Sequence, residues 1–250
     1  MTTAIVGSFI EQWRRFFATA DLPIAFYYSN SADGCAPPTG RAHCMIAELG
    51  AVRNGRAVAF SADSIHCGGG KTYSGFSTHL RDEFEYFLSC GIPGKLEGER
   101  YKKSPELVRE HLKSQQPFAA PAKYLVFKRL DQLAASDQPL AVVFFATPDL
   151  LAGLFTLANF GAPDPNGVIA PFCSGCSSII FYPMHEGKSA TPRATLGMFD
   201  VSARPHLPAT MLTFAVPWAK FVTMTVNMPE SFLITESWEA VRNRLERAHS

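Results

Sequence analysis

Residues 140–146 limit the fold of this chain more than any other stretch, because all of them are apolar. A run of this length is typical of a strand, and a strand that is apolar on both sides must be covered on both sides. Thr147, Pro148 and Asp149 follow directly and are typical of a helix start. The run therefore predicts a buried central strand that leads into a helix ending near Gly161.

Apolar periodicity predicts further elements on either side of this strand. Helices are expected over residues 5–17, 42–52, 80–90, from 104 onwards, 217–228 and 235–248, and strands over 22–28, 57–60, 123–130, 195–199 and 211–216. No convincing linker separates them, and no internal repeat is visible. The sequence thus predicts an α/β (mixed α+β) fold, with a central mixed sheet flanked by helices in a single compact unit. We expect one domain over residues 1–250.

Charge and hydropathy exclude several functional classes. The net charge is +1 at pH 7, which leaves no basic surface for a nucleic acid. No apolar run approaches the roughly 20 residues that a membrane helix needs. The first residues lack the basic region and the long apolar run of a signal peptide. We therefore expect a cytoplasmic protein that binds neither nucleic acid nor a membrane.

Cys173 and Cys176 form a Cys-x-x-Cys motif between two apolar runs. Two intervening residues allow both sulfur atoms to bind one metal ion. A structural zinc site would usually have a second such pair, which this chain lacks. Cys44 and Cys67 are isolated thiols that could complete a four-cysteine set. This pattern suits an iron–sulfur cluster at least as well as zinc.

The glycines after Cys67 are a second candidate feature. Gly68, Gly69 and Gly70 come shortly after a predicted strand, and a glycine-rich loop at a sheet edge often holds a ligand. A phosphate-binding loop would need glycine where this chain has Ile65, so we do not expect a nucleotide site. The three glycines remain candidate ligand contacts.

Two other interpretations of the thiols stay open. Cys67 or Cys176 could be a reactive thiolate, because a helix that begins near Ser177 would lower the pKa of the Cys176 thiol. The protein would then be a thiol-dependent enzyme or a small-ligand-binding protein. Alternatively, the thiols are inert core side chains and the protein acts by contacting another protein.

Several longer motifs resemble one known family. They are CGGG at 67–70, YSGF at 73–76, FLSCGIPG at 87–94, GERYKKSP at 98–105, PF at 171–172, GC at 175–176, LGMFDVSARP at 196–205 and LTFAVP at 212–217. From about Trp13 to the C-terminal helix, the chain resembles the family called domain of unknown function 169. The family has no assigned activity, so the resemblance implies one compact unit but no reaction.

The resemblance also bears on the cysteines. The family pattern implies cysteine at Cys44, Cys67 and Cys176. Cys173 departs from that pattern, which weakens the Cys-x-x-Cys pair as a unit. Cys90 lies within a matched motif and becomes, with Cys173, a candidate fourth ligand.

Arg204 is the last candidate contact. Its guanidinium could bind a carboxylate or phosphate of a ligand, or brace its own loop through an internal ion pair. Together, these observations predict a metal or iron–sulfur centre at Cys44, Cys67 and Cys176, with the cluster favoured over zinc. We expect a redox or accessory role, with a small molecule or a redox partner protein bound. The sequence leaves open whether the protein is an enzyme.

Overall fold

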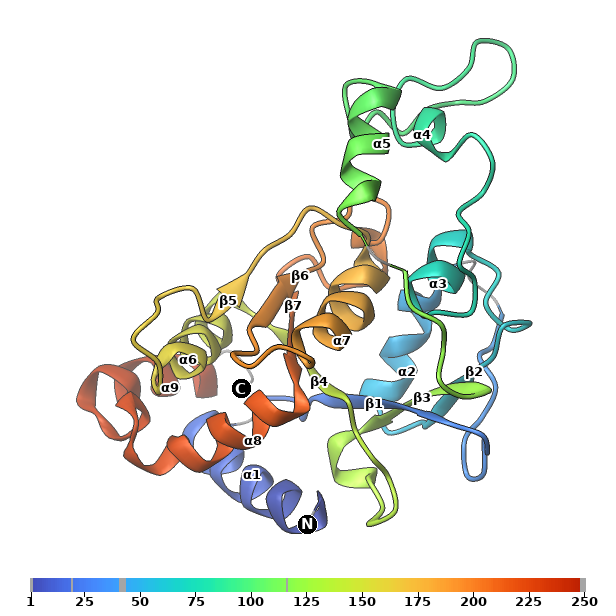
Figure 1. The fold of residues 1–250 in the computed structure, drawn as a ribbon. Coiled ribbons are helices and arrows are strands. Elements are labelled where there is room, and N and C mark those ends of the chain that lie inside the picture. Colours follow the sequence, from blue (N-terminus) through green and yellow to red (C-terminus); the bar gives the residue numbers. More distant parts are fainter. Residues whose placement is uncertain (1, 19, 41–43, 116, 248–250) are drawn as a thin grey trace.

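A mixed sheet forms the centre of the molecule in the computed structural model, which describes residues 2–18, 20–40, 44–115 and 117–247. Within these ranges the sheet has seven strands in the order β2-β3-β1-β4-β7-β6-β5 (Figure 1). The strands are β1 (Ile24–Ser29), β2 (Val58–Phe60), β3 (Tyr124–Arg129), β4 (Ala141–Ala146), β5 (Val168–Ile169), β6 (Ala194–Gly197) and β7 (Leu212–Pro217). β5 and β6 pair in parallel, and the other neighbouring strands are antiparallel. The predicted mixed sheet is confirmed.

The predicted central strand is β4, the fourth in this order. It pairs with β1 on one side and β7 on the other, and every one of its residues is buried. Val142 and Phe144 belong to one hydrophobic cluster, whereas Val143 and Phe145 belong to another. Because neighbouring side chains of a strand point to opposite faces, the two clusters lie on the two faces of the sheet. Both faces are covered, as the apolar run requires.

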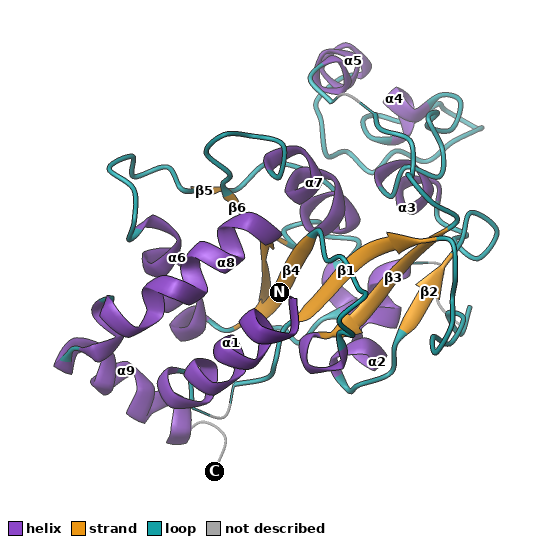
Figure 2. Ribbon diagram, turned by 60° about the horizontal axis from the view of Figure 1, so that its bottom comes forward, coloured by secondary structure: helices purple, strands orange, loops and turns teal. Residues whose placement is uncertain are grey.

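Helices supply these covers (Figure 2). The first cluster contains residues of α1, α6, α8 and α9, and the second contains residues of α2 and α3, with α7 packed against it. The helices are α1 (Thr2–Phe16), α2 (Leu49–Arg53), α3 (Gly68–Tyr73), α4 (Phe84–Phe87), α5 (Pro105–Lys113), α6 (Pro148–Asn159), α7 (Tyr182–Glu186), α8 (Trp218–Asn227) and α9 (Glu236–Arg247). None of the helices in the described ranges combines the length and the apolar character needed to cross a bilayer.

Two of the predicted helices differ from those observed. The helix expected over 42–52 begins outside the described residues, and its visible part is a 3-10 turn, Met45–Glu48, followed by α2. The helix expected over 80–90 is shortened to α4, because Glu83 before it has a left-handed backbone with a φ of 60°. A non-glycine residue in this conformation interrupts a right-handed helix.

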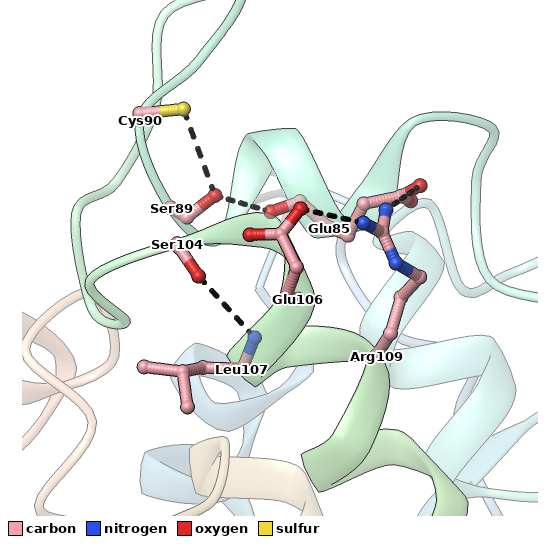
Figure 3. Close-up of polar contacts among 7 residues, drawn as sticks. All are labelled: Glu85, Ser89, Cys90, Ser104, Glu106, Leu107 and Arg109. Carbon is pink, nitrogen blue, oxygen red and sulfur yellow. Dashed lines mark hydrogen bonds and ion pairs between the residues drawn. The ribbon is translucent and has the colours of Figure 1, made fainter.

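The segment that holds α4 and α5 projects from the body of the molecule (Figure 1). We call residues 77–115 the α4–α5 lobe. Arg109 joins its two helices, since its guanidinium lies 3.1 Å from the carboxylate of Glu85 and 2.8 Å from that of Glu106 (Figure 3). The Ser104 hydroxyl caps α5 by accepting a hydrogen bond from a backbone N–H of its first turn. Polar contacts within the lobe thus hold its two helices together.

Candidate functional site

A cavity of about 240 Å³ lies between the α4–α5 lobe and the second face of the sheet. The lobe contributes Phe84, Phe87, Leu88, Glu99, Tyr101 and His111 to its wall. The body contributes Cys44, Ile46, Cys67, Gly69, Tyr73, Phe172, Cys173, Ser174, Gly175, Cys176, Phe199, Asp200, Val201, Ser202 and Ala203. Aromatic and aliphatic side chains make up much of this wall. Cysteines that are far apart in the sequence therefore meet at one partly open and largely apolar cavity.

Three of the cavity cysteines lie directly before helical turns. Cys44 precedes the 3-10 turn, and Cys67 precedes α3. Cys176 precedes a π-helical turn at Ser177–Phe181. The Cys67 sulfur also accepts a hydrogen bond from the backbone N–H of Gly70, with an N···S distance of 3.5 Å. Cys44 and Cys67 have extended backbone and therefore occupy equivalent positions at the change to helical backbone, whereas Cys176 is already helical.

The Cys-x-x-Cys segment, residues 173–176, is held against the loop that follows β6. The N–H of Gly175 donates to the carboxylate of Asp200 at 3.0 Å. The same carboxylate accepts the N–H and the hydroxyl of Ser202, at 3.0 and 2.8 Å. A Cβ atom at Gly175 would lie only 2.8 Å from the sulfur of Met198. Glycine is required there because the two segments approach so closely.

Burial keeps most of the cavity thiols protonated. It raises the pKa of Cys173 from 9.0 to about 12, and it also raises the pKa of Cys44 and of Cys176. Cys176 is buried within the second hydrophobic cluster, with 7% of its surface exposed. The expectation that a helix start lowers the pKa of Cys176 is therefore wrong. Removal of the thiolate from water outweighs the helix dipole at this position.

The cysteines approach one another without forming a ready metal site. Cys44 and Cys67 lie close enough to Cys176 for their charges to raise its pKa further. Even so, the described part of the chain contains no group of three cysteine, histidine, aspartate or glutamate side chains arranged to hold a metal ion. The predicted ligands are neighbours, but in this conformation they line a cavity.

A comparison with protein families adds to this description. The family model for domain of unknown function 169 (DUF169), described as uncharacterised ArCR, matches residues 17–227. The chain belongs to this family. No curated protein and no solved structure gives a significant match. The matched region contains the four cavity cysteines and the whole α4–α5 lobe, so the cavity lies within the DUF169 domain.

Cys90 and Arg204 of this DUF169 protein, both predicted site residues, lie away from the cavity wall. Cys90 is exposed on the lobe, where its thiol lies 3.4 Å from the carbonyl oxygen of Gly91 (Figure 3 shows Cys90 and its neighbour Ser89). Arg204 donates to the carbonyl oxygens of Met211 and Ala209, at 2.5 and 2.9 Å. It therefore braces its own loop, through backbone carbonyls rather than an ion pair.

The glycine-rich stretch of this DUF169 protein is helical. Gly68, Gly69 and Gly70 form the start of α3, so the predicted loop at this position is wrong. Gly69 contributes to the cavity wall. Gly70 is buried, and a Cβ atom there would lie 2.9 Å from a methyl group of Ile65. Close packing of α3 against Ile65 explains why residue 70 is a glycine.

A polar chain across the cavity was not predicted from the sequence. The Tyr73 hydroxyl donates to the side-chain oxygen of Gln115 at 3.1 Å, and the Gln115 amide nitrogen lies 3.2 Å from Nε2 of His111. Burial, followed by the charge of Lys102, lowers the pKa of His111. Nε2 of a neutral His111 accepts from the amide, which leaves the proton on Nδ1. No short sequence pattern relates these residues, because they come from two separate elements.

Proposed function

We propose that the cavity of this DUF169 protein binds a small, largely apolar molecule beside Cys67. The observation that carries the proposal is the convergence of four thiols and several aromatic rings on one partly open cavity. Ligand sites are typically apolar cavities of about 300–1,000 Å³ with a few placed polar groups. A cavity of about 240 Å³ lies just below that range, which favours a small ligand.

Cys67 is the thiol to which we assign the chemical role. Its side chain is partly exposed, so a reagent or ligand can reach it, and its sulfur is held in place by the N–H of Gly70. The raised pKa values of Cys44, Cys173 and Cys176 favour a different role for those thiols, as neutral lining of the cavity. Under this proposal the protein is a thiol-dependent enzyme or a ligand-binding protein of the cytoplasm.

An iron–sulfur or zinc centre is the second candidate function. It is favoured by the proximity of Cys44, Cys67 and Cys176, which the electrostatic coupling of their thiols reflects. Cys173 lines the same cavity and would be the fourth ligand in preference to Cys90. Binding of a metal would deprotonate these thiols and would require them to move together.

The two candidates differ in what an anaerobic preparation contains. We expect protein without stoichiometric iron, zinc or sulfide, in which iodoacetamide modifies Cys67 faster than Cys44, Cys173 or Cys176. Exposed Cys90 provides the control for reagent activity.

Two results would overturn this proposal. Stoichiometric iron and sulfide that disappear in a Cys67→Ser, Cys176→Ser double variant would establish the metal centre instead. Resistance of Cys67 to iodoacetamide until the chain unfolds would leave an inert core thiol, and the protein would then act by contacting another protein.

A further inference from the structure

The charged groups around the cavity are unevenly distributed. Asp200 and Glu99 contribute carboxylates to its wall, whereas no lysine or arginine among the described residues does so. His111, whose pKa is lowered by burial, adds a neutral ring. In a largely apolar space, such a wall produces a negative potential that attracts cations and repels anions.

Aromatic rings reinforce this preference. Tyr73, Phe84, Phe87, Tyr101, Phe172 and Phe199 all contribute to the wall. The face of an aromatic ring carries partial negative charge and attracts ammonium and guanidinium groups.

Two of these rings already hold cations of the chain itself. The ammonium group of Lys102 lies 4.2 Å from the ring centre of Phe172, and the guanidinium carbon of Arg81 lies 4.9 Å from that of Phe87. Lys102 and Arg81 are not among the wall residues, so Asp200 and Glu99 are the charged groups of the wall itself, although Lys102 lies close enough to lower the pKa of His111.

We propose that the cavity selects a small organic cation, such as a primary amine or a quaternary ammonium group attached to an apolar body. This inference rests on the proposed function and names the class of its ligand. The apolar body would contact the rings and neutral thiols, and the cationic group would lie toward Asp200 and Glu99. An anionic ligand of the same size would meet two carboxylates and no basic wall residue.

Thiol reagents of different charge test the potential at Cys67 without knowledge of the natural ligand. Methanethiosulfonates with a methyl, a trimethylammonioethyl or a sulfonatoethyl group are neutral, cationic and anionic. In each case the Cys67 thiol gives its proton to solvent, and its sulfur attacks the sulfenyl sulfur of the reagent. The reagent's S–S bond breaks, methanesulfinate leaves with the electron pair, and a mixed disulfide forms.

We expect the cationic reagent to modify Cys67 about tenfold faster than the anionic one, after each rate is divided by that for a small free thiol. Cys90, which is exposed and outside the cavity, should show no such preference and serves as the internal control. Glu99→Gln should reduce the preference at Cys67 about threefold, and Glu97→Gln, on the same exposed hairpin but outside the wall, should leave it unchanged. Benzylammonium, and not benzoate, should protect Cys67 from the neutral reagent.

The possible failures are distinguishable. If the neutral reagent leaves Cys67 unmodified in the folded protein, the cavity is not an accessible thiol site and the proposed function is wrong. If the neutral reagent reacts but the anionic reagent is as fast as the cationic one, the proposed function stands and the cation preference is refuted. Equal protection by benzylammonium and benzoate would refute it as well.

Discussion

Replacing Gly175 by alanine should deform the wall of the cavity, because the added methyl group has no space. Its Cβ atom would lie 2.8 Å from the Met198 sulfur, 2.9 Å from the Ala203 Cβ and 3.4 Å from a side-chain carbon of Ile46. The Met198 side chain is buried, and the Ala203 Cβ is fixed directly to the backbone. One of the two segments that Asp200 holds together must therefore shift.

The expected loss in the free energy of unfolding follows from two opposing effects. Overpacking of this kind costs about 1–3 kcal/mol. Alanine in place of glycine at the start of a helical turn stabilises the protein by about 0.5–1 kcal/mol, because it restricts the unfolded chain. Gly175→Ala should therefore destabilise the protein by about 1 kcal/mol, and by at most about 2.5 kcal/mol. It should also open the wall near Cys173 and Cys176.

Urea denaturation and alkylation together test this expectation. The Gly175→Ala midpoint should fall while the m value stays constant, and native-state alkylation of Cys173 and Cys176 should accelerate about tenfold. Gly68→Ala is the matched control, because Gly68 is also in a first helical turn but its Cβ would meet nothing within 4 Å. If Gly175→Ala is as stable as Gly68→Ala and its thiols are equally protected, the close approach of the two segments does not hold the wall.

Three further predictions concern acid–base behaviour and local hydrogen bonds. Because burial raises the pKa of Cys173 from 9.0 to about 12, ionisation of this thiol favours the unfolded chain, and the free energy of unfolding should fall as pH rises from about 9 to about 12. Urea denaturation of Cys173→Ala should show a shallower fall over this pH range. The same pH dependence in the variant and the wild type would contradict this. Ser104→Ala removes the cap of α5 and should cost that helix about 1 kcal/mol, seen as about fivefold faster amide exchange there, with unchanged exchange as the contrary result. Tyr73→Phe leaves Gln115 without its hydroxyl donor, so nitrogen NMR should report the Nδ1–H tautomer of His111 in the wild type and a mixture in the variant; an Nε2–H wild type would refute the polar chain.

Local sequence predicted the secondary-structure elements correctly where the chain is buried on both sides. The β4 run is apolar on both faces, and α6 begins at Pro148 as expected, because a strand and a helix start of this kind depend on neighbouring residues. The short α4 depends instead on the left-handed backbone of Glu83. A glutamate carries no local signal for that conformation, so the longer helix was predicted.

The sequence predicted which cysteines line the candidate site better than it predicted their protonation state. Thiol chemistry together with the family resemblance singled out Cys44, Cys67 and Cys176, and all three line the cavity. Their protonation depends on how deeply the packed wall buries them, which no sequence spacing contains. His111 reaches the cavity only because α5 folds back over the body, and Gln115 contacts it from just beyond that helix, so their role could be seen only in three dimensions.

The π-helical turn after Cys176 connects the packing of the sheet with the chemistry of the cavity. Such turns are rare and are frequent at functional sites, since they displace side chains from the positions that an α-helix would give them. Here the turn buries the Ser177 hydroxyl beside the Cys173 thiol, where it offsets part of the rise that burial causes in the pKa of Cys173. A buried hydroxyl without a partner costs about 1–3 kcal/mol, which packing alone would not favour over alanine. A polar contact with the Cys173 thiol, which stays neutral in the cavity wall, therefore explains a serine at this position better than packing alone.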